Sequence, residues 1–124
     1  RAAFISPARA ALDRGLRYTE HHDAPVALPS SIMILATQVN RTTRSGQVLG
    51  PDQRVSPMDA IRSTTINAAY QYFEEDRKGS IEPGKLADLV ILDANPLEVP
   101  PEELFDLEVV ETIKEGRTVY RRDE

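Results

Sequence analysis

The 124-residue sequence contains no cysteine, and its only histidines are the adjacent pair His21 and His22. Without cysteine the chain can form no disulfide, offers no thiolate to a metal and carries no thiol nucleophile. A reducing cytoplasm is the simplest location for such a chain. Any metal site built from these residues would depend on the two histidines and on carboxylates, which are the other common protein ligands of zinc.

Long apolar runs are also absent. No stretch approaches the ~20 apolar residues that span a bilayer, and Arg1 opens no signal-like segment, so we expect no membrane partner. Apolar residues make up 40% and charged residues 28% of the chain, which is typical of a globular domain. The sequence does not begin with methionine, which indicates processing or a segment cut from something longer.

Positive charge is scarce in the second half of the chain. Up to Ala60 there are seven basic and five acidic residues, whereas beyond it there are eight basic and fifteen acidic residues. The net charge of the whole chain is −5. An acidic surface repels phosphate backbones, so the sequence predicts no nucleic-acid partner. The arginines of the first half are scattered, as on solvated helix faces.

The first elements are predicted to be a helix, a tight turn and a strand. Ser6 and Pro7 are suited to begin a short helix as cap and first residue, and Gly15 is suited to end it. The following segment, 16–22 (LRYTEHH), is predicted to be a strand. A helix followed at once by a strand is half of a βαβ repeat.

Two further helices are expected in the middle of the chain, separated by a long loop over 41–54. Ser30 or Ser31 can cap the first. The second is predicted from Ser56 to about Phe73, with Ser56 as cap and proline next. Its apolar stripe is broad, which indicates packing on two sides. The stripe comprises Met58, Ile61, Thr65, Ala68, Ala69 and Tyr72, widened by Ile66 and Phe73.

The last third of the sequence favours turns and strands. The charged run 74–78 is predicted to be a solvated loop, and Pro83-Gly84 fits a type II turn. The apolar run 89–92 predicts a strand buried on both faces. A helical turn is expected over 100–107, and the end of the chain predicts a hairpin around Glu115-Gly116.

The residues with the most chemical promise lie where the predicted strand 16–22 ends. Side chains alternate along a strand, so His21 and His22 should face opposite sides, whereas His21 and Asp23 could face the same side. On spacing alone, a His-x-Asp pair is more typical of a solvated turn. However, barrels of alternating strands and helices place their active sites at the carboxyl ends of strands, where Asp23 stands. The sequence holds no H-x-H, H-E-x-x-H or G-x-S-x-G motif and no phosphate-binding glycine loop.

Three blocks of sequence carry a family resemblance over nearly the whole chain. They are AAFISPARAALDRGLRYTEHHDAPV, then RVSPMDAIRSTTINAAYQYFEEDRKGSIEPGKLADLVILDANPL, then VVETIKEGRTVY. In this order they resemble the C-terminal third of enzymes of the third amidohydrolase family, which includes N-substituted formamide deformylase-like enzymes and relatives named as exoenzyme regulators. GSIEPGKLADLVILD is the block most typical of the superfamily, and it indicates the fold rather than the chemistry.

The resemblance implies a metal-dependent (β/α)₈ barrel with a small β-sandwich, hydrolysing C–N bonds other than peptide bonds in small amide-type substrates. The chain would then be an α+β fragment: residues 1–78 would hold the last helix and strand of the barrel with its closing helices, and residues 79–124 the C-terminal part of the β-sandwich. The main partner of the chain would be the upstream remainder of the barrel.

The resemblance also assigns a role to Asp23, which matches the family's aspartate at the end of the last barrel strand. That residue is expected to touch a divalent metal, zinc in our expectation, and to move the proton of the attacking water. His22 occupies a position where the family often has serine or glycine, and His21 is the neighbour next considered as a site residue. The remaining ligands of the family should lie upstream of Arg1.

Two ligands are too few for a catalytic zinc, so the chain alone is expected to bind no metal and to be inactive. We also expect it to self-associate, because a strand taken from a barrel has unpaired edges. Two other interpretations remain: a non-catalytic binding or dimerisation module, or a truncated gene product.

Overall fold

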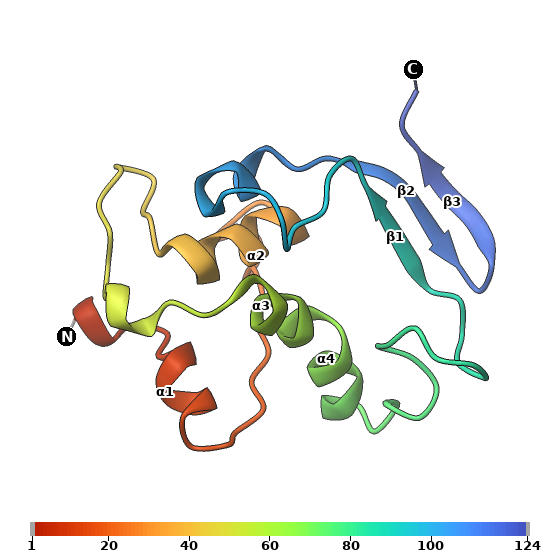
Figure 1. The fold of residues 1–124 in the computed structure, drawn as a ribbon, viewed down its shortest axis with the longest axis horizontal. Coiled ribbons are helices and arrows are strands. Elements are labelled where there is room, and N and C mark those ends of the chain that lie inside the picture. Colours follow the sequence, from red (N-terminus) through yellow and green to blue (C-terminus); the bar gives the residue numbers. More distant parts are fainter. Residues whose placement is uncertain (1, 124) are drawn as a thin grey trace.

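Helices occupy the first part of the chain and strands the last part (Figure 1). The computed structural model describes residues 2–123. The α-helices are α1 (Ala8–Leu12), α2 (Ser31–Asn40), α3 (Pro57–Thr64) and α4 (Ile66–Gln71). The strands are β1 (Leu89–Leu92), β2 (Val109–Lys114) and β3 (Arg117–Arg121), and short 3₁₀ turns are η1 (Ala2–Phe4), η2 (Pro51–Gln53) and η3 (Pro101–Asp106). No helix over 2–123 is both long and apolar enough to cross a membrane.

Helix α2 is the centre of the hydrophobic core. The Ser30 hydroxyl accepts a hydrogen bond from the Met33 N–H at 3.2 Å, which confirms the predicted cap. Helix α3 and the η3 turn pack against α2, and Leu104 of η3 is fully buried there. Asn40 donates through its side chain to the Pro101 carbonyl at 2.6 Å, which ties the end of α2 to η3. The core comprises Ala8, Leu35, Ala36, Val39, Val55, Ala60, Leu104 and Leu107.

The first helix was predicted with an error of one residue at its start, and the long loop was predicted correctly. The first helix begins one residue later than expected, because Ser6 has φ 45° and Pro7 is the residue that precedes α1. Its cap provides no side-chain hydrogen bond. The loop predicted over 41–54 is confirmed, with a Thr42–Val48 bridge and the η2 turn inside it.

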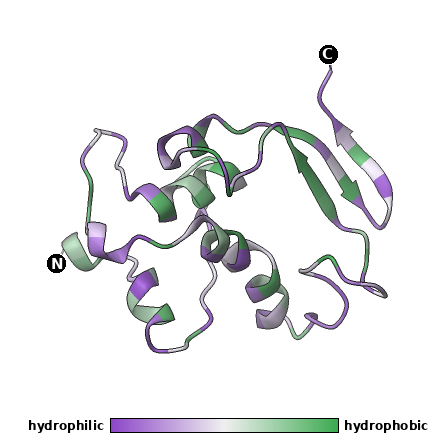
Figure 2. Cartoon of the chain, viewed as in Figure 1, coloured by the Kyte–Doolittle hydropathy of each residue, from purple (hydrophilic) through white to green (hydrophobic). Residues whose placement is uncertain are grey.

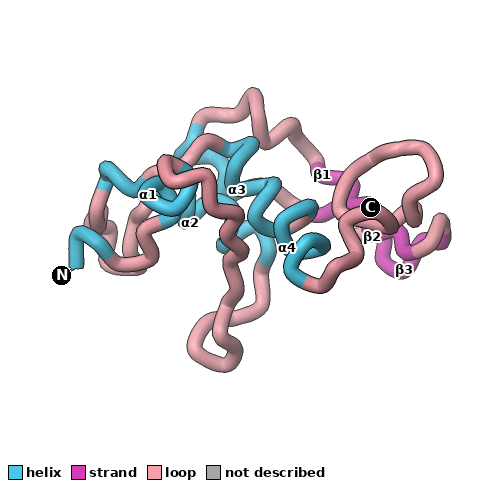
Figure 3. Tube along the Cα trace, turned by 90° about the horizontal axis from the view of Figure 1, so that it is seen from below, coloured by secondary structure: helices cyan, strands magenta, loops and turns pink. Residues whose placement is uncertain are grey.

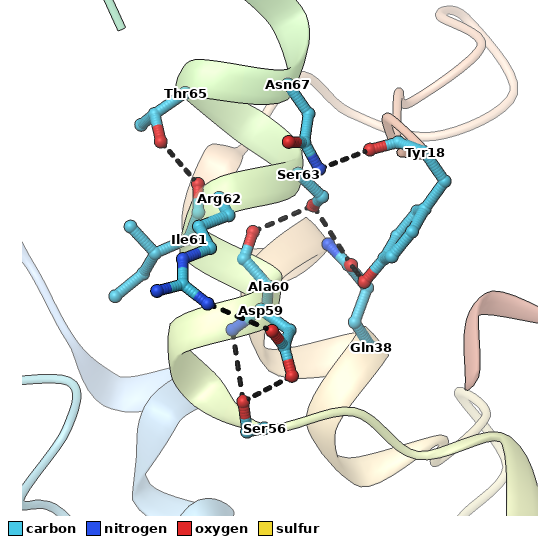
Figure 4. A network of polar contacts seen from close by, with 10 residues as sticks. All are labelled: Tyr18, Gln38, Ser56, Asp59, Ala60, Ile61, Arg62, Ser63, Thr65 and Asn67. Carbon is cyan, nitrogen blue, oxygen red and sulfur yellow. Dashed lines mark hydrogen bonds and ion pairs between the residues drawn. The ribbon is translucent and has the colours of Figure 1, made fainter. Parts of the chain in front are cut away.

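The single helix predicted from Ser56 to Phe73 is wrong, because the chain breaks at Thr65 into α3 and α4. The cap at Ser56 is confirmed, since its hydroxyl accepts from the Asp59 N–H at 3.1 Å. Ser63, Thr64 and Thr65 are three consecutive hydroxyl residues, and each bonds to a backbone carbonyl three or four residues earlier. Figure 4 shows these bonds for Ser63 and Thr65. Side chains that compete for helix carbonyls in this way bend helices.

The predicted apolar stripe of that helix is confirmed only in part, since Ala69 is buried and Ile61 packs against the core, whereas other members are exposed. The residues that α3 and α4 bury are Ala60, Ser63 and Ala69, whereas Tyr72 and Phe73 are 73% and 90% exposed. Because the helix is interrupted at Thr65, residues before and after it no longer share one face. The charged run 74–78 is a turn, as predicted, and Lys78 and Glu74 form an ion pair at 2.7 Å.

The strand predicted over 16–22 is absent, because these residues pair with no strand in the part of the chain that the structure describes. The segment instead lies along the helices through side chains. Asn67 donates to the Tyr18 carbonyl at 3.0 Å, and the Thr19 hydroxyl to Gln71 at 2.9 Å. A β-strand requires backbone hydrogen bonds to a neighbouring strand. In this segment the Tyr18 carbonyl accepts from the Asn67 side chain instead. Beyond this segment, the connection to α2 projects as a long loop (Figure 3).

The strands form an antiparallel sheet in the order β1-β2-β3. The predicted hairpin is confirmed, with Glu115 and Gly116 at φ 50° and 76° in the turn between β2 and β3. The predicted turn at Pro83-Gly84 is confirmed by φ 91° at the glycine. The helical turn predicted over 100–107 is present as η3.

Strand β1 is not buried on both faces, which contradicts its prediction. Val90 and Ile91 are 56% and 44% exposed, although the strand is hydrophobic along its length (Figure 2). It pairs with β2 alone, and nothing within residues 2–123 covers its outer edge. The apolar run 89–92 therefore predicts a burial of β1 that residues 2–123 by themselves do not provide.

Gly50 should be more sensitive to alanine than Gly46. A Cβ atom at Gly50 would lie 2.0 Å from the Ala3 carbonyl oxygen, whereas one at Gly46 meets nothing within 4 Å. Both glycines have positive φ, which costs an L-residue roughly 1–2 kcal/mol. Gly50→Ala should therefore lower the free energy of unfolding by about 1–3 kcal/mol more than Gly46→Ala. Urea denaturation of both variants measures the difference, and equal losses would contradict the close approach to Ala3.

The chain on its own should self-associate through the open edge of β1. Exposed apolar strand edges recruit other strands, and a lysine placed on such an edge blocks pairing. Ile91→Lys is therefore expected to shift light-scattering masses toward monomer over a wide concentration range. The same change at exposed Leu97, which lies outside the strands, is the control and should have little effect. A wild-type chain that is monomeric at every concentration would refute this expectation.

Candidate functional site

Asp23 lies in the exposed loop that follows segment 16–22. Its backbone has φ 54°, and its N–H donates to Nδ1 of His21 at 3.1 Å. In this bond Nδ1 of His21 is the acceptor, so the bond forms when that nitrogen carries no proton. The two residues expected to act together are therefore neighbours in space, joined through the Asp23 backbone rather than through its carboxylate.

An open cavity of about 680 Å³ lies beside this pair. His21 and His22 both line it, together with Glu20 and with residues of α2, of the loop after α2 and of the N-terminal segment. The expectation that the two histidines face opposite sides depended on a strand over 16–22, which is absent here, so their side chains need not alternate. Asp23 itself is not among the lining residues. The remaining lining residues are Ile5, Ser6, Ala27, Met33, Ile34, Thr37, Gln38, Arg41, Thr42, Thr43, Arg44, Leu49 and Phe105.

The His22 side chain contains a buried polar atom without a protein partner among the described residues. Its Nε2 is buried and has no hydrogen-bond partner within residues 2–123. Buried polar atoms are nearly always hydrogen-bonded, so this nitrogen is an exception among the described residues. His22 was predicted only as a departure from the family pattern, and its position on the cavity wall was not foreseen.

Glu20 adds a carboxyl group to the wall. Burial raises the pKa of Glu20, and the charges of Arg41 and His21 oppose this rise. A carboxyl group with a raised pKa is neutral up to a higher pH than an exposed one, so it contributes less negative charge to the cavity. No pattern in the sequence points to this residue, which occupies an ordinary polar position in the predicted strand.

Arg41 is the residue that holds the cavity wall together. It is 8% exposed, has φ 60° and directly follows α2. Its guanidinium donates to the carbonyls of Leu49 and Ser6, each at 2.9 Å, and to the carbonyl of Ile5. The interpretation of the arginines in the first half of the chain as solvated is therefore wrong for Arg41. The carbonyls that it binds belong to the N-terminal segment and to the following loop, and no pattern in the sequence places them beside Arg41.

Behind the cavity, a buried polar network fixes segment 16–22 to the helices (Figure 4). The Tyr18 hydroxyl donates to the side-chain oxygen of Gln38 at 2.9 Å, and the Ser63 hydroxyl lies 3.0 Å from the same oxygen. Burial raises the pKa of Tyr18 to about 12, and the charges of Glu20 and Asp59 raise it further. Tyr18 is therefore a permanent donor at neutral pH, and the network can hold the strand-like segment in one position.

The carboxylate and imidazole side chains near Asp23 are of types that bind metal ions, but there are too few of them among the described residues to form a site. Carboxylate and imidazole are ligands that zinc takes, and a catalytic site usually has three from the protein. Within residues 2–123, no group of three histidine, aspartate or glutamate side chains is arranged to hold a metal ion. Asp23 and His21 could supply only part of a site, and the rest would have to come from other residues.

Known proteins resemble this chain along nearly its whole length. The model of the amidohydrolase family matches residues 1–120. N-substituted formamide deformylase of Arthrobacter pascens is 38% identical over 118 residues, which is 95% of this chain and 22% of that enzyme. Imidazolonepropionase of Streptococcus sanguinis is 31% identical over 96 residues, which is 77% of this chain and 21% of that enzyme.

A solved structure shares the fold. An amidohydrolase from Thermotoga maritima superposes with a TM-score of 0.66 and 28% identity, over 90% of this chain and 24% of its own length. The chain thus spans less than a quarter of the proteins it matches. Because the family model covers all but the last few residues, and the same elements recur in a solved amidohydrolase, this chain belongs to the amidohydrolase family.

Proposed function

We propose that this chain is the C-terminal part of a metal-dependent enzyme that hydrolyses C–N bonds other than peptide bonds. The observation that carries the proposal is the 38% identity to N-substituted formamide deformylase, which extends over the segment that holds His21 and Asp23. The cavity beside that segment supports it, since ligand sites are concave and largely apolar, with a few polar groups that orient the ligand.

The proposal divides the chain into two parts. Residues 1–78 would be the last helix and strand of a (β/α)₈ barrel with its closing helices, and residues 79–124 would be part of a β-sandwich. Two features support this division. Segment 16–22 leads to Asp23, as a barrel strand would lead to its active-site end, and β1 has an apolar outer edge that a further strand would cover.

Asp23 is proposed to be both metal ligand and general base. Its carboxylate would take a proton from the attacking water and deliver it to the leaving nitrogen. A bound divalent cation, zinc in this proposal, would supply polarisation of the water and of the amide carbonyl. The His21 ring would position the reacting carboxylate, because its Nδ1 accepts the Asp23 N–H and so sets the backbone there. The missing ligands would come from the remainder of the barrel.

Asp23→Asn in the enzyme that contains this segment should abolish turnover without unfolding the protein. The substitution keeps the shape of the side chain and removes the base, which alone costs about 10²- to 10⁴-fold in rate. Steady-state kinetics on N-substituted formamides measures the loss, and circular dichroism checks the fold. Asp52→Asn, at an exposed position in η2, is the matched control and should keep its activity. A kcat near the wild-type value in Asp23→Asn would show that Asp23 is a turn residue.

The chain by itself should hydrolyse no amide. Two candidate ligands fall short of the three that a catalytic zinc usually takes from protein. Purified chain with added Zn²⁺ is to be assayed against N-formyl amines, N-acyl amino acids and cyclic amides. Metal-dependent turnover that disappears in Asp23→Asn would overturn this expectation. If the chain is inactive and also remains so within any longer protein, the exposed apolar edge of β1 favours a binding or dimerisation module instead.

A further inference from the structure

Tyr18 attaches segment 16–22 to two helices at once. Its hydroxyl donates to the side-chain oxygen of Gln38 in α2 at 2.9 Å, and its backbone carbonyl accepts from the side chain of Asn67 in α4 at 3.0 Å (Figure 4). Tyr18 also packs against the hydrophobic core. Because one bond comes from the tip of the side chain and the other from the backbone, the two together fix both the position and the rotation of the chain at this point.

Tyr18 is also the last partly buried attachment before Asp23. The next residue, Thr19, donates to Gln71 at 2.9 Å, but this bond is exposed to solvent, where water competes for both groups. From Thr19 to Asp23, no backbone group bonds to a helix or strand within residues 2–123, and the Asp23 N–H reaches only His21. The course of the chain from the core to Asp23 is therefore set at Tyr18.

The Tyr18 hydroxyl supplies Gln38 with a proton that no other side chain supplies as directly. The Gln38 amide nitrogen donates to the Ile34 carbonyl at 3.3 Å, which leaves the amide oxygen to accept from Tyr18. The Ser63 hydroxyl lies 3.0 Å from that oxygen, but it also lies 2.7 Å from the Ala60 carbonyl, and it has a single proton for these two acceptors. Because the pKa of Tyr18 is raised to about 12, its hydroxyl keeps its proton throughout the neutral range. The bond from Tyr18 is therefore the one that joins the segment to α2.

From these contacts we propose that Tyr18 is a positioning residue for Asp23, and that its bond to Gln38 fixes where the Asp23 carboxylate stands relative to the attacking water. This inference rests on the proposed function and deepens it, because it names a residue that acts through the general base without touching substrate or metal. In a barrel, neighbouring strands would hold the segment along the sheet, whereas the Tyr18 hydroxyl sets its position against the helices. Reaction rates depend steeply on such placement, since a displacement of about 1 Å can cost about 100-fold.

Tyr18→Phe in the enzyme that contains this segment tests the role, because it removes only the hydroxyl. With saturating Zn²⁺ and N-substituted formamides as substrates, kcat should fall by about 10-fold while KM changes little. This split is expected because Tyr18 takes no part in substrate binding, whereas the chemical step depends on the placement of Asp23. The assay is run well below the unfolding temperature of the variant, so that a loss of folded protein does not contribute.

A second variant separates positioning from stability. Tyr18→Phe combined with Gln38→Met removes both partners of the bond and leaves the Ser63 hydroxyl paired with the Ala60 carbonyl, so that these groups are not left unpaired. The midpoint of thermal unfolding should then recover, but kcat should stay low. Leu107→Val is the matched control, because it removes one carbon from the core at a residue outside the Tyr18 network. It should lower the stability and keep the wild-type kcat.

The outcomes separate this inference from the proposed function. A wild-type kcat in Tyr18→Phe, a loss through KM alone, or a kcat that recovers together with stability in the double variant would each overturn the positioning role. The hydrolase function then stands if Asp23→Asn still abolishes turnover. If Asp23→Asn leaves turnover unchanged, the proposed function falls, and this inference falls with it.

Discussion

The buried side chain of Gln38 joins parts of the chain that are far apart in sequence, and the positions of the cavity and of Asp23 depend on it. It is 6% exposed, its oxygen lies within hydrogen-bond distance of the Tyr18 and Ser63 hydroxyls, and its amide group donates to the Ile34 carbonyl. Its own carbonyl accepts from the Val55 N–H. Segment 16–22, α2 and α3 therefore meet at one residue. In a low-dielectric interior such a satisfied network is strong, and loss of any member leaves the others unpaired.

Arg41 extends this framework from the core to the cavity. The network around Gln38 places segment 16–22 on α2, and Arg41, one turn further along the chain, attaches the N-terminal residues and the following loop to the end of the same helix. The cavity lies between these attached segments. A rigid helix with polar anchors along its length is a suitable support for a binding site, because site geometry depends on the residues behind it.

Local signals in the sequence predicted a good part of the fold. The caps at Ser30 and Ser56, the turn at Pro83-Gly84 and the hairpin at Glu115-Gly116 depend on residues close together in the chain, and all are present. The failures concern features set by distant neighbours. The strand 16–22 and the burial of β1 both need partners that residues 2–123 do not supply.

In the candidate site, too, contacts between residues close in sequence were predicted, whereas contacts between distant residues were not. The closeness of His21 and Asp23 follows from their spacing and was expected, although the contact is made by the Asp23 N–H. The places of Arg41 and Glu20 in the wall could not be predicted from the sequence, because they arise where α2 meets segments 20 and 35 residues away along the chain. The helix break at Thr65 was partly predictable. The three adjacent hydroxyl residues are visible in the sequence, but the sequence does not show that their hydroxyls bond to helix carbonyls.

The η3 turn lies in the connection between β1 and β2, and this has a consequence for how the molecule opens. Leu104 from η3 is fully buried among the helices, and Asn40 of α2 binds the Pro101 carbonyl at the start of the turn. The sheet therefore cannot detach from the helices without exposing Leu104 and breaking that bond. The amide hydrogens of β2 and of α2 should thus exchange with solvent through one shared opening of the structure, whereas the loop carrying Asp23 opens separately and more often.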